Sequence, residues 1–140
     1  MRNDLAGTSA HPDSWIRIVA AVIVGFVAWT VLFLGSNSGI LALAPGAFNP
    51  DGSIDSTSLL VLFLALSIVF SVVAGWIASK IARSRSFGSC VVLGVLLLAV
   101  GVMVQIQYWD VMPVWYHIGF LGMLIPGVLL GYRIAVPRGL

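Results

Sequence analysis

Four long apolar runs dominate this sequence: 16–34, 59–78, 87–106 and 111–132. Apart from Arg17 near the beginning of the first run, they contain no Asp, Glu, Lys or Arg. A helix rises about 1.5 Å per residue and the bilayer core is about 30 Å thick, so one crossing needs roughly 20 apolar residues. Unbroken apolar runs in lipid favour helices over strands. The sequence predicts an all-α integral membrane protein, a four-transmembrane-helix bundle that forms a single domain of 140 residues.

The composition excludes most soluble functions. Hydrophobic residues make up 60% of the chain and charged residues 9%, whereas soluble domains have about 45–50% and about 25%. Seven Lys or Arg residues against five Asp or Glu residues are too small an excess to form a nucleic-acid-binding surface. Cys90 is the only cysteine, so no disulfide can form within the chain. We therefore expect the lipid bilayer as the main partner, and no nucleic acid.

The positions of the basic residues predict the orientation, because short loops rich in Lys and Arg stay cytoplasmic. The basic residues of the chain are Arg2, Arg17, Lys80, Arg83, Arg85, Arg133 and Arg138. They lie at the N-terminal side of the first run, between the second and third runs, and after the fourth run. The connection at 35–58, which we expect to be an exterior loop, and the short connection at 107–110 contain Asp51, Asp55 and Asp110 but no Lys or Arg. We expect two antiparallel hairpins with cytoplasmic N and C termini, in a cell membrane and most simply a bacterial inner membrane.

The exterior loop has two local features. Oxygen-bearing side chains alternate over 49–55, but Ile54 and Leu60 stand where a calcium loop needs Gly and Glu, so we predict a plain turn. Several hydroxyl and carboxyl side chains then precede the second run and can cap a helix. The second helix is predicted to begin near Thr57.

Small residues form narrow stripes on two of the runs. In lipid, small residues permit close backbone approach and therefore mark the faces where helices meet. These packing residues are Ser67, Ser71, Gly75 and Ser79 at the second run and Gly119, Gly127 and Gly131 in the fourth. The stripes either close the chain's own bundle or face another subunit, and the spacing alone leaves both open.

Polar and aromatic residues gather at the outer end of the last two runs. His117 is the one ionisable side chain well inside a predicted span, and such residues are functional candidates by default. Its nearest candidate partners are Gln105, Gln107 and Asp110, which together with it would form a polar vestibule. A neutral imidazole hydrogen-bonded inside the bundle is the simplest interpretation. We expect no cofactor and no metal ion, with His117 as a haem or chlorophyll ligand the alternative.

Reactive chemistry is nearly absent from the sequence. It has no phosphate loop, zinc-protease helix, nucleophile elbow or Cys-x-x-Cys pair. The leading interpretation is a non-enzymatic integral membrane protein, an accessory or scaffold subunit that packs against itself or a larger membrane complex through its small-residue faces. The alternative is a small channel or carrier with a vestibule around His117. A third is a tetrapyrrole-binding subunit of a redox or light-harvesting assembly.

Overall fold

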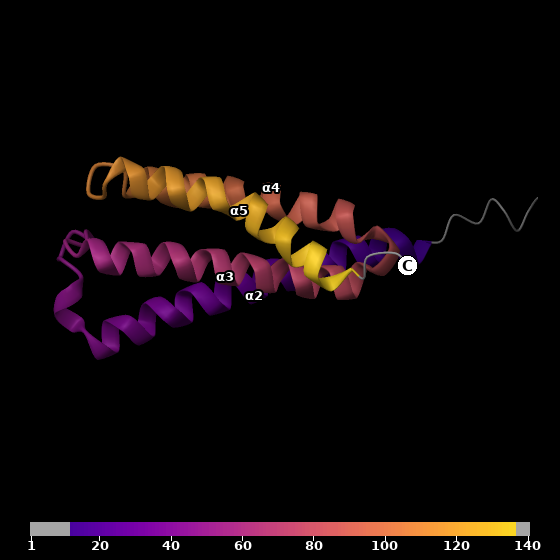
Figure 1. Ribbon diagram of the computed structural model, residues 1–140, viewed down its shortest axis with the longest axis horizontal. Helices are drawn as coiled ribbons and strands as arrows, with labels where there is room; N and C mark the ends of the chain where they lie inside the picture. The colour runs from indigo at the N-terminus through magenta and orange to yellow at the C-terminus, as the bar shows by residue number, and fades with distance from the viewer. Residues whose placement is uncertain (1–11, 137–140) are drawn as a thin grey trace, which may run out of the picture.

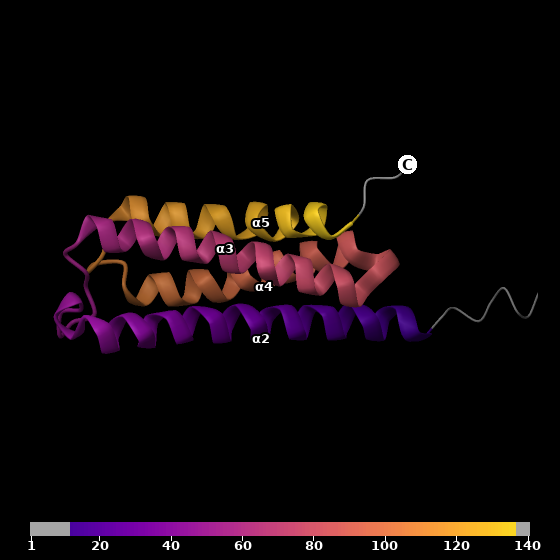
Figure 2. The same cartoon turned by 60° about the horizontal axis from the view of Figure 1, so that its bottom comes forward.

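The structure is a computed structural model that describes residues 12–136, and within that part of the chain it is helical without strands. Its elements are α2 (Pro12–Leu43), η1 (Pro45–Ala47), α3 (Thr57–Ala82), η2 (Arg83–Arg85), α4 (Ser86–Gln107) and α5 (Val114–Ala135), where η marks a short 3-10 helix. Figures 1 and 2 show the four α-helices aligned along one long axis, with η2 reversing the chain between α3 and α4.

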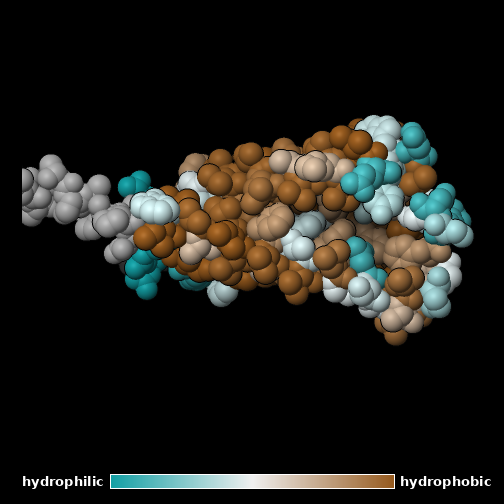
Figure 3. All heavy atoms as spheres, turned by 180° about the vertical axis from the view of Figure 1, so that it is seen from behind, coloured by the Kyte–Doolittle hydropathy of each residue, from teal (hydrophilic) through white to brown (hydrophobic). Residues whose placement is uncertain are grey.

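Three helical segments are long and apolar enough to cross a membrane. They are Trp15–Leu43, Thr57–Gln107 and Val114–Ala135, and the middle one contains both α3 and α4. Large apolar side chains such as Val31, Met103 and Ile118 are more than 60% exposed on the outside of these helices. Figure 3 shows the resulting apolar surface along most of the molecule, with polar residues concentrated toward the ends. The coarse prediction of an all-helical chain suited to lipid is therefore confirmed.

Several helix ends differ from the predicted spans, since α2 begins at Pro12 rather than near 16 and α3 ends at Ala82 rather than near 78. The first helix continues to Leu43 instead of ending near 34, so the connection to α3 is 44–56, which contains η1, rather than the expected loop 35–58. Ile40 packs against the core and its carbonyl accepts a hydrogen bond from the Ala44 N–H at 2.8 Å, which keeps this polar, glycine-containing stretch helical. The last helix begins at Val114 rather than near 111, because Pro113 lies at its N-cap with extended geometry.

The beginning of α3 follows the sequence prediction. Thr57 is its first residue, and the Ser56 side chain accepts a hydrogen bond from the Leu59 N–H at 3.2 Å. This is the N-cap arrangement in which a side-chain oxygen satisfies one of the unpaired N–H groups of the first turn.

The turn at 49–53 is held by side-chain hydrogen bonds. Asn49 Nδ2 donates to Ser53 Oγ at 2.9 Å, and both the backbone N–H and the hydroxyl of Ser53 donate to Asp51 Oδ1, at 2.9 and 2.6 Å. Gly52 has φ +86° and lies against the Tyr108 ring, so that a Cβ added there would be 2.9 Å from Tyr108 Cε1. The predicted turn is confirmed, and glycine suits both its dihedral and its close contact.

We expect the pKa of Asp51 to lie below its ordinary value of 3.8, because Ser53 donates two hydrogen bonds to the carboxylate. A lowered pKa means that these bonds stabilise the turn above about pH 4 and are lost as the pH falls through the folded-state pKa. Carboxyl NMR shifts of the protein in micelles would measure this titration. In Ser53→Ala the midpoint should rise toward 3.8, and a wild-type midpoint at the ordinary value, unmoved by this change, would contradict the turn geometry.

Candidate functional site

His117 is held at the end of the α4–α5 hairpin that lies away from η2. The last turn of α4 brings Gln105, and the first turn of α5 brings His117, which is fully buried. His117 Nδ1 pairs with Gln105 Oε1, and Nε2 faces the backbone oxygen of Trp109 at 3.3 Å. The Trp109 ring stacks on the imidazole with centroids 4.6 Å apart. Both ring nitrogens and one face of the ring are therefore already in contact with the chain.

The other two predicted vestibule residues lie elsewhere. Gln107 and Asp110 are exposed, and within residues 12–136 neither makes a hydrogen bond to His117. Gln107 follows Gln105 by two residues, which is about 200° around a helix, so the two side chains point to opposite sides. The structure thus brings together Gln105 and His117 and leaves the remaining pair at the surface.

The small-residue stripes of α3 and α5 lie against each other. A Cβ added to Gly75 would be 2.1 Å from the carbonyl oxygen of Val128, and one added to Gly131 would be 2.1 Å from that of Val72. A Cβ added to Gly127 would be 2.7 Å from Ser71 Cβ. A Cβ added to Gly119 would be 3.4 Å from Leu64 Cδ1, which is an ordinary contact distance. At Gly75 and Gly131 the two backbones approach too closely for any side chain larger than hydrogen.

The serine hydroxyl groups of the α3 stripe form hydrogen bonds within their own helix. Ser67, Ser71 and Ser79 are buried, and each hydroxyl donates to a backbone carbonyl three or four residues earlier, at 2.7 to 2.9 Å. Ser71 also accepts from the indole N–H of Trp29 on α2 at 3.1 Å. These side chains are small enough for close packing, and their polar atoms are paired.

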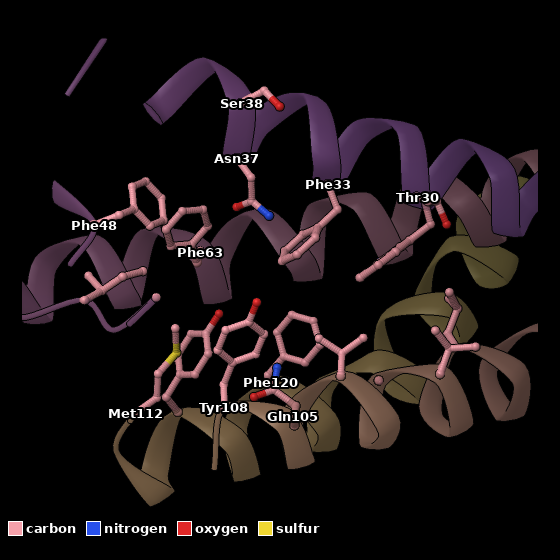
Figure 4. A pocket seen from close by; sticks show the side chains of 18 of the residues that line it. Thr30, Phe33, Asn37, Ser38, Phe48, Phe63, Gln105, Tyr108, Met112 and Phe120 are labelled. Carbon is pink, nitrogen blue, oxygen red and sulfur yellow. The ribbon is translucent and has the colours of Figure 1, made fainter. Parts of the chain in front are cut away.

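A cavity that was not predicted from the sequence lies in the half of the molecule away from η2. It has a volume of about 450 Å³ and is lined by α2, the C-terminal part of α4, the beginning of α5, Phe63 of α3 and the connections (Figure 4). The backbones of α2 and α5 stay apart in the described chain, and the two helices meet through aromatic rings, with the centroids of Phe33 and Phe120 5.5 Å apart. This separation leaves the space. The sequence does contain a signal: Phe26, Trp29, Phe33 and Asn37 recur every three or four residues, on one face of a helix.

In the described part of the chain, no group of three or more His, Cys, Asp or Glu side chains is placed to hold a metal ion. Comparisons with known proteins found no matching family model, curated protein or solved structure. The function has to be inferred from the residues of this chain and their arrangement.

Proposed function

We propose that this chain crosses a cell membrane four times, with both termini on the cytoplasmic side, and acts there as a non-enzymatic accessory protein. The charges favour this orientation. Arg17, Lys80 and Arg133 lie at the end of the bundle that contains η2, whereas Asp51 and Asp110 lie in the connections at the opposite end (Figure 2). Because basic ends stay cytoplasmic, α3 and α4 then form two separate crossings joined by a cytoplasmic turn.

The observation that carries the non-enzymatic role is the pairing of the buried polar side chains. Each of them has a hydrogen-bond partner within the described chain. These residues are Ser67, Ser71, Ser79, Ser86, Ser89, Gln105 and His117. A catalytic site needs a nucleophile or a base with a free position toward substrate. Here the hydroxyl groups of the buried serines and both ring nitrogens of His117 are occupied by structural hydrogen bonds, which favours a role in packing and binding over a role in chemistry.

The surface available for a partner lies on α2. Gly35 and Gly39 are exposed, and no atom lies within 4 Å of a Cβ added to either. Their four-residue spacing permits another helix to approach closely. Only 17% of the most apolar stretch of α2 is buried inside the chain, against 33% for the other two segments. We propose that a second copy of this chain packs here, because a self-complementary helix face closes into a symmetric dimer.

Replacing Gly39 with leucine should weaken this dimer by about tenfold or more, which corresponds to about 1.4 kcal/mol. Leucine would hold the two helices apart at the point of closest approach. The protein's mass in mild detergent, measured by light scattering over a concentration series, reports the dimer. Gly122→Leu on α5 is the matched control, because a Cβ there also has no neighbour within 4 Å. A wild-type chain that is monomeric and carries no second protein would contradict the accessory role.

The channel and pigment interpretations have less support. The cavity is lined on α2 only from Phe26 outward, and below it a Cβ on Gly25 would be 2.7 Å from Leu93 Cδ2 and 3.5 Å from Ala78 Cβ. The helices are thus in contact across the inner half of the bundle, where a channel would need a path. A tetrapyrrole metal at His117 would have to displace one of its two hydrogen bonds.

A further inference from the structure

The length of the cavity corresponds to one leaflet of a bilayer. Its lining residues on α4 and the following turn extend from Leu97 to Tyr108, and those on α2 extend from Phe26 to Leu41. The eleven residue steps between 97 and 108 correspond to about 16 Å at 1.5 Å per residue, and the fifteen steps between 26 and 41 correspond to about 22 Å. One leaflet is about 15 Å thick in its hydrocarbon part and about 20–22 Å with its headgroup region, so the cavity is about as long as one leaflet.

The chemistry of the lining changes along this length. The inner end is apolar and is formed by Phe26, Leu97 and Val100. Toward the outer end Asn37 and Tyr108 face each other across the space between α2 and α4 (Figure 4). No Asp, Glu, Lys or Arg lines the cavity. This arrangement matches a molecule with a hydrocarbon body toward the midplane and an uncharged polar group toward the outer surface.

Two buried residues direct unpaired hydrogen-bond donors into the cavity. Gln105 is 5% exposed and Tyr116 4% exposed, and both line it. The Gln105 carbonyl is held by His117, which leaves its amide N–H₂ group without a partner in residues 12–136, and the Tyr116 hydroxyl also has none there. No side-chain N or O atom in that range is both fully buried and unpaired. These two donors are therefore not fully enclosed by protein atoms, and both residues line the cavity. Figure 4 shows Gln105 at its edge.

We propose that the cavity binds an uncharged amphipathic lipid with one hydrocarbon chain, of the monoacylglycerol class, taken from the outer leaflet. The hydrocarbon chain lies between α2 and α4, and the ester carbonyl accepts hydrogen bonds from the Gln105 amide and the Tyr116 hydroxyl. A volume of about 450 Å³ is in the range of small-molecule sites, about 300–1,000 Å³. A charged headgroup would lose its hydration without gaining a counter-charge. The hollow visible in Figure 3 gives lateral access. This site depends on the membrane location proposed above and not on the dimer.

The test is photolabelling of the full chain in phosphatidylcholine nanodiscs. The probe is a monoacylglycerol with a diazirine near the end of its chain, and labelled residues are identified by mass spectrometry. We expect labelling near Phe26 and Leu97, lost in the presence of excess unlabelled monooleoylglycerol. The fatty acid with the same diazirine chain should label these positions at least tenfold less. Labelling spread over the exposed helix faces and insensitive to competitor would overturn the proposal, as would equal labelling by the anionic fatty acid.

Three variants locate the site. Val100→Phe fills the inner end of the cavity and should reduce competed labelling at least tenfold, while Val102→Phe, on the same helix but 37% exposed and outside the lining, should leave it unchanged. Tyr116→Phe removes one hydroxyl and should weaken binding about threefold to tenfold, the effect of one hydrogen bond. If Val100→Phe fails to fold, the proposal is tested by the weaker labelling of Tyr116→Phe and by the competition with unlabelled monooleoylglycerol. Absent labelling in a chain that still dimerises removes the lipid site and leaves the accessory role standing.

Discussion

Replacing Gly131 with alanine should lower the free energy of unfolding by about 3 kcal/mol, at the upper end of the usual cost of overpacking. The added Cβ would be 2.1 Å from the carbonyl oxygen of Val72 and 2.8 Å from the backbone nitrogen of Trp76. Backbone atoms cannot rotate away as a side chain does, so the two helices have to separate along their whole contact. Unfolding in a detergent–SDS titration, followed by circular dichroism, would measure the change.

Gly122→Ala is the control on the same helix, because a Cβ at Gly122 has no neighbour within 4 Å. Alanine is the better helix former by about 1 kcal/mol, so this variant should be as stable as the wild type or more stable. Gly75→Ala should resemble Gly131→Ala, since its Cβ would be 2.1 Å from the carbonyl oxygen of Val128. The two changes together should cost less than their sum, because one separation of α3 from α5 relieves both clashes. Equal stabilities of Gly131→Ala and Gly122→Ala would rule out this close approach.

The sequence identifies the residues of this contact but not their partner. Four-residue spacing of small side chains predicts that Ser71, Gly75 and Gly131 lie where helices meet. The same spacing fits contact within the chain and contact with another subunit, because the pattern records only the size of the side chains. The alignment of Gly75 with Val128 and of Gly131 with Val72 is a tertiary property. It depends on the lengths of the connections and on the relative height of the two helices.

Other features depend on contacts between helices, which no single apolar run of the sequence predicts. The stretch 35–39 has the composition of a loop, yet it is helical because Ile40 beyond it is anchored in the core. The cavity forms because α2 packs closely on α3 and α4, whereas it reaches α5 through long aromatic side chains: Trp29 and Phe33 meet Phe120 with ring centroids 6.1 and 5.5 Å apart. The grouping of Gln105 with Gln107 is different, since helical periodicity alone places their side chains on opposite sides. The separation of Gln107 from Gln105 can therefore be read from the sequence.

Replacing either His117 or Gln105 should lower the free energy of unfolding by more than their hydrogen bond contributes to it. His117→Phe keeps a ring against Trp109, but it leaves the Gln105 carbonyl buried at the hairpin without its partner. An unsatisfied buried polar group costs about 1–3 kcal/mol, so each of His117→Phe and Gln105→Leu should destabilise the chain by about 2 kcal/mol. The double variant replaces both groups by apolar ones and should be more stable than the sum predicts, with a coupling of about 1–2 kcal/mol. The same SDS unfolding titration measures the free energy of unfolding of the wild type, the two single variants and the double variant.

The variants Gln107→Leu and Asp110→Asn test whether His117 and Gln105 form an isolated structural pair or belong to a larger polar vestibule. Both residues are exposed and, within the described chain, make no hydrogen bond to His117. Each change should therefore leave stability within about 0.5 kcal/mol of wild type, as surface substitutions do, and show no coupling to His117→Phe. A vestibule in which all four polar groups share water or an ion would instead couple Gln107 and Asp110 to His117 as strongly as Gln105. Such coupling would contradict the structural pair and favour a solute path at the outer end of α4 and α5.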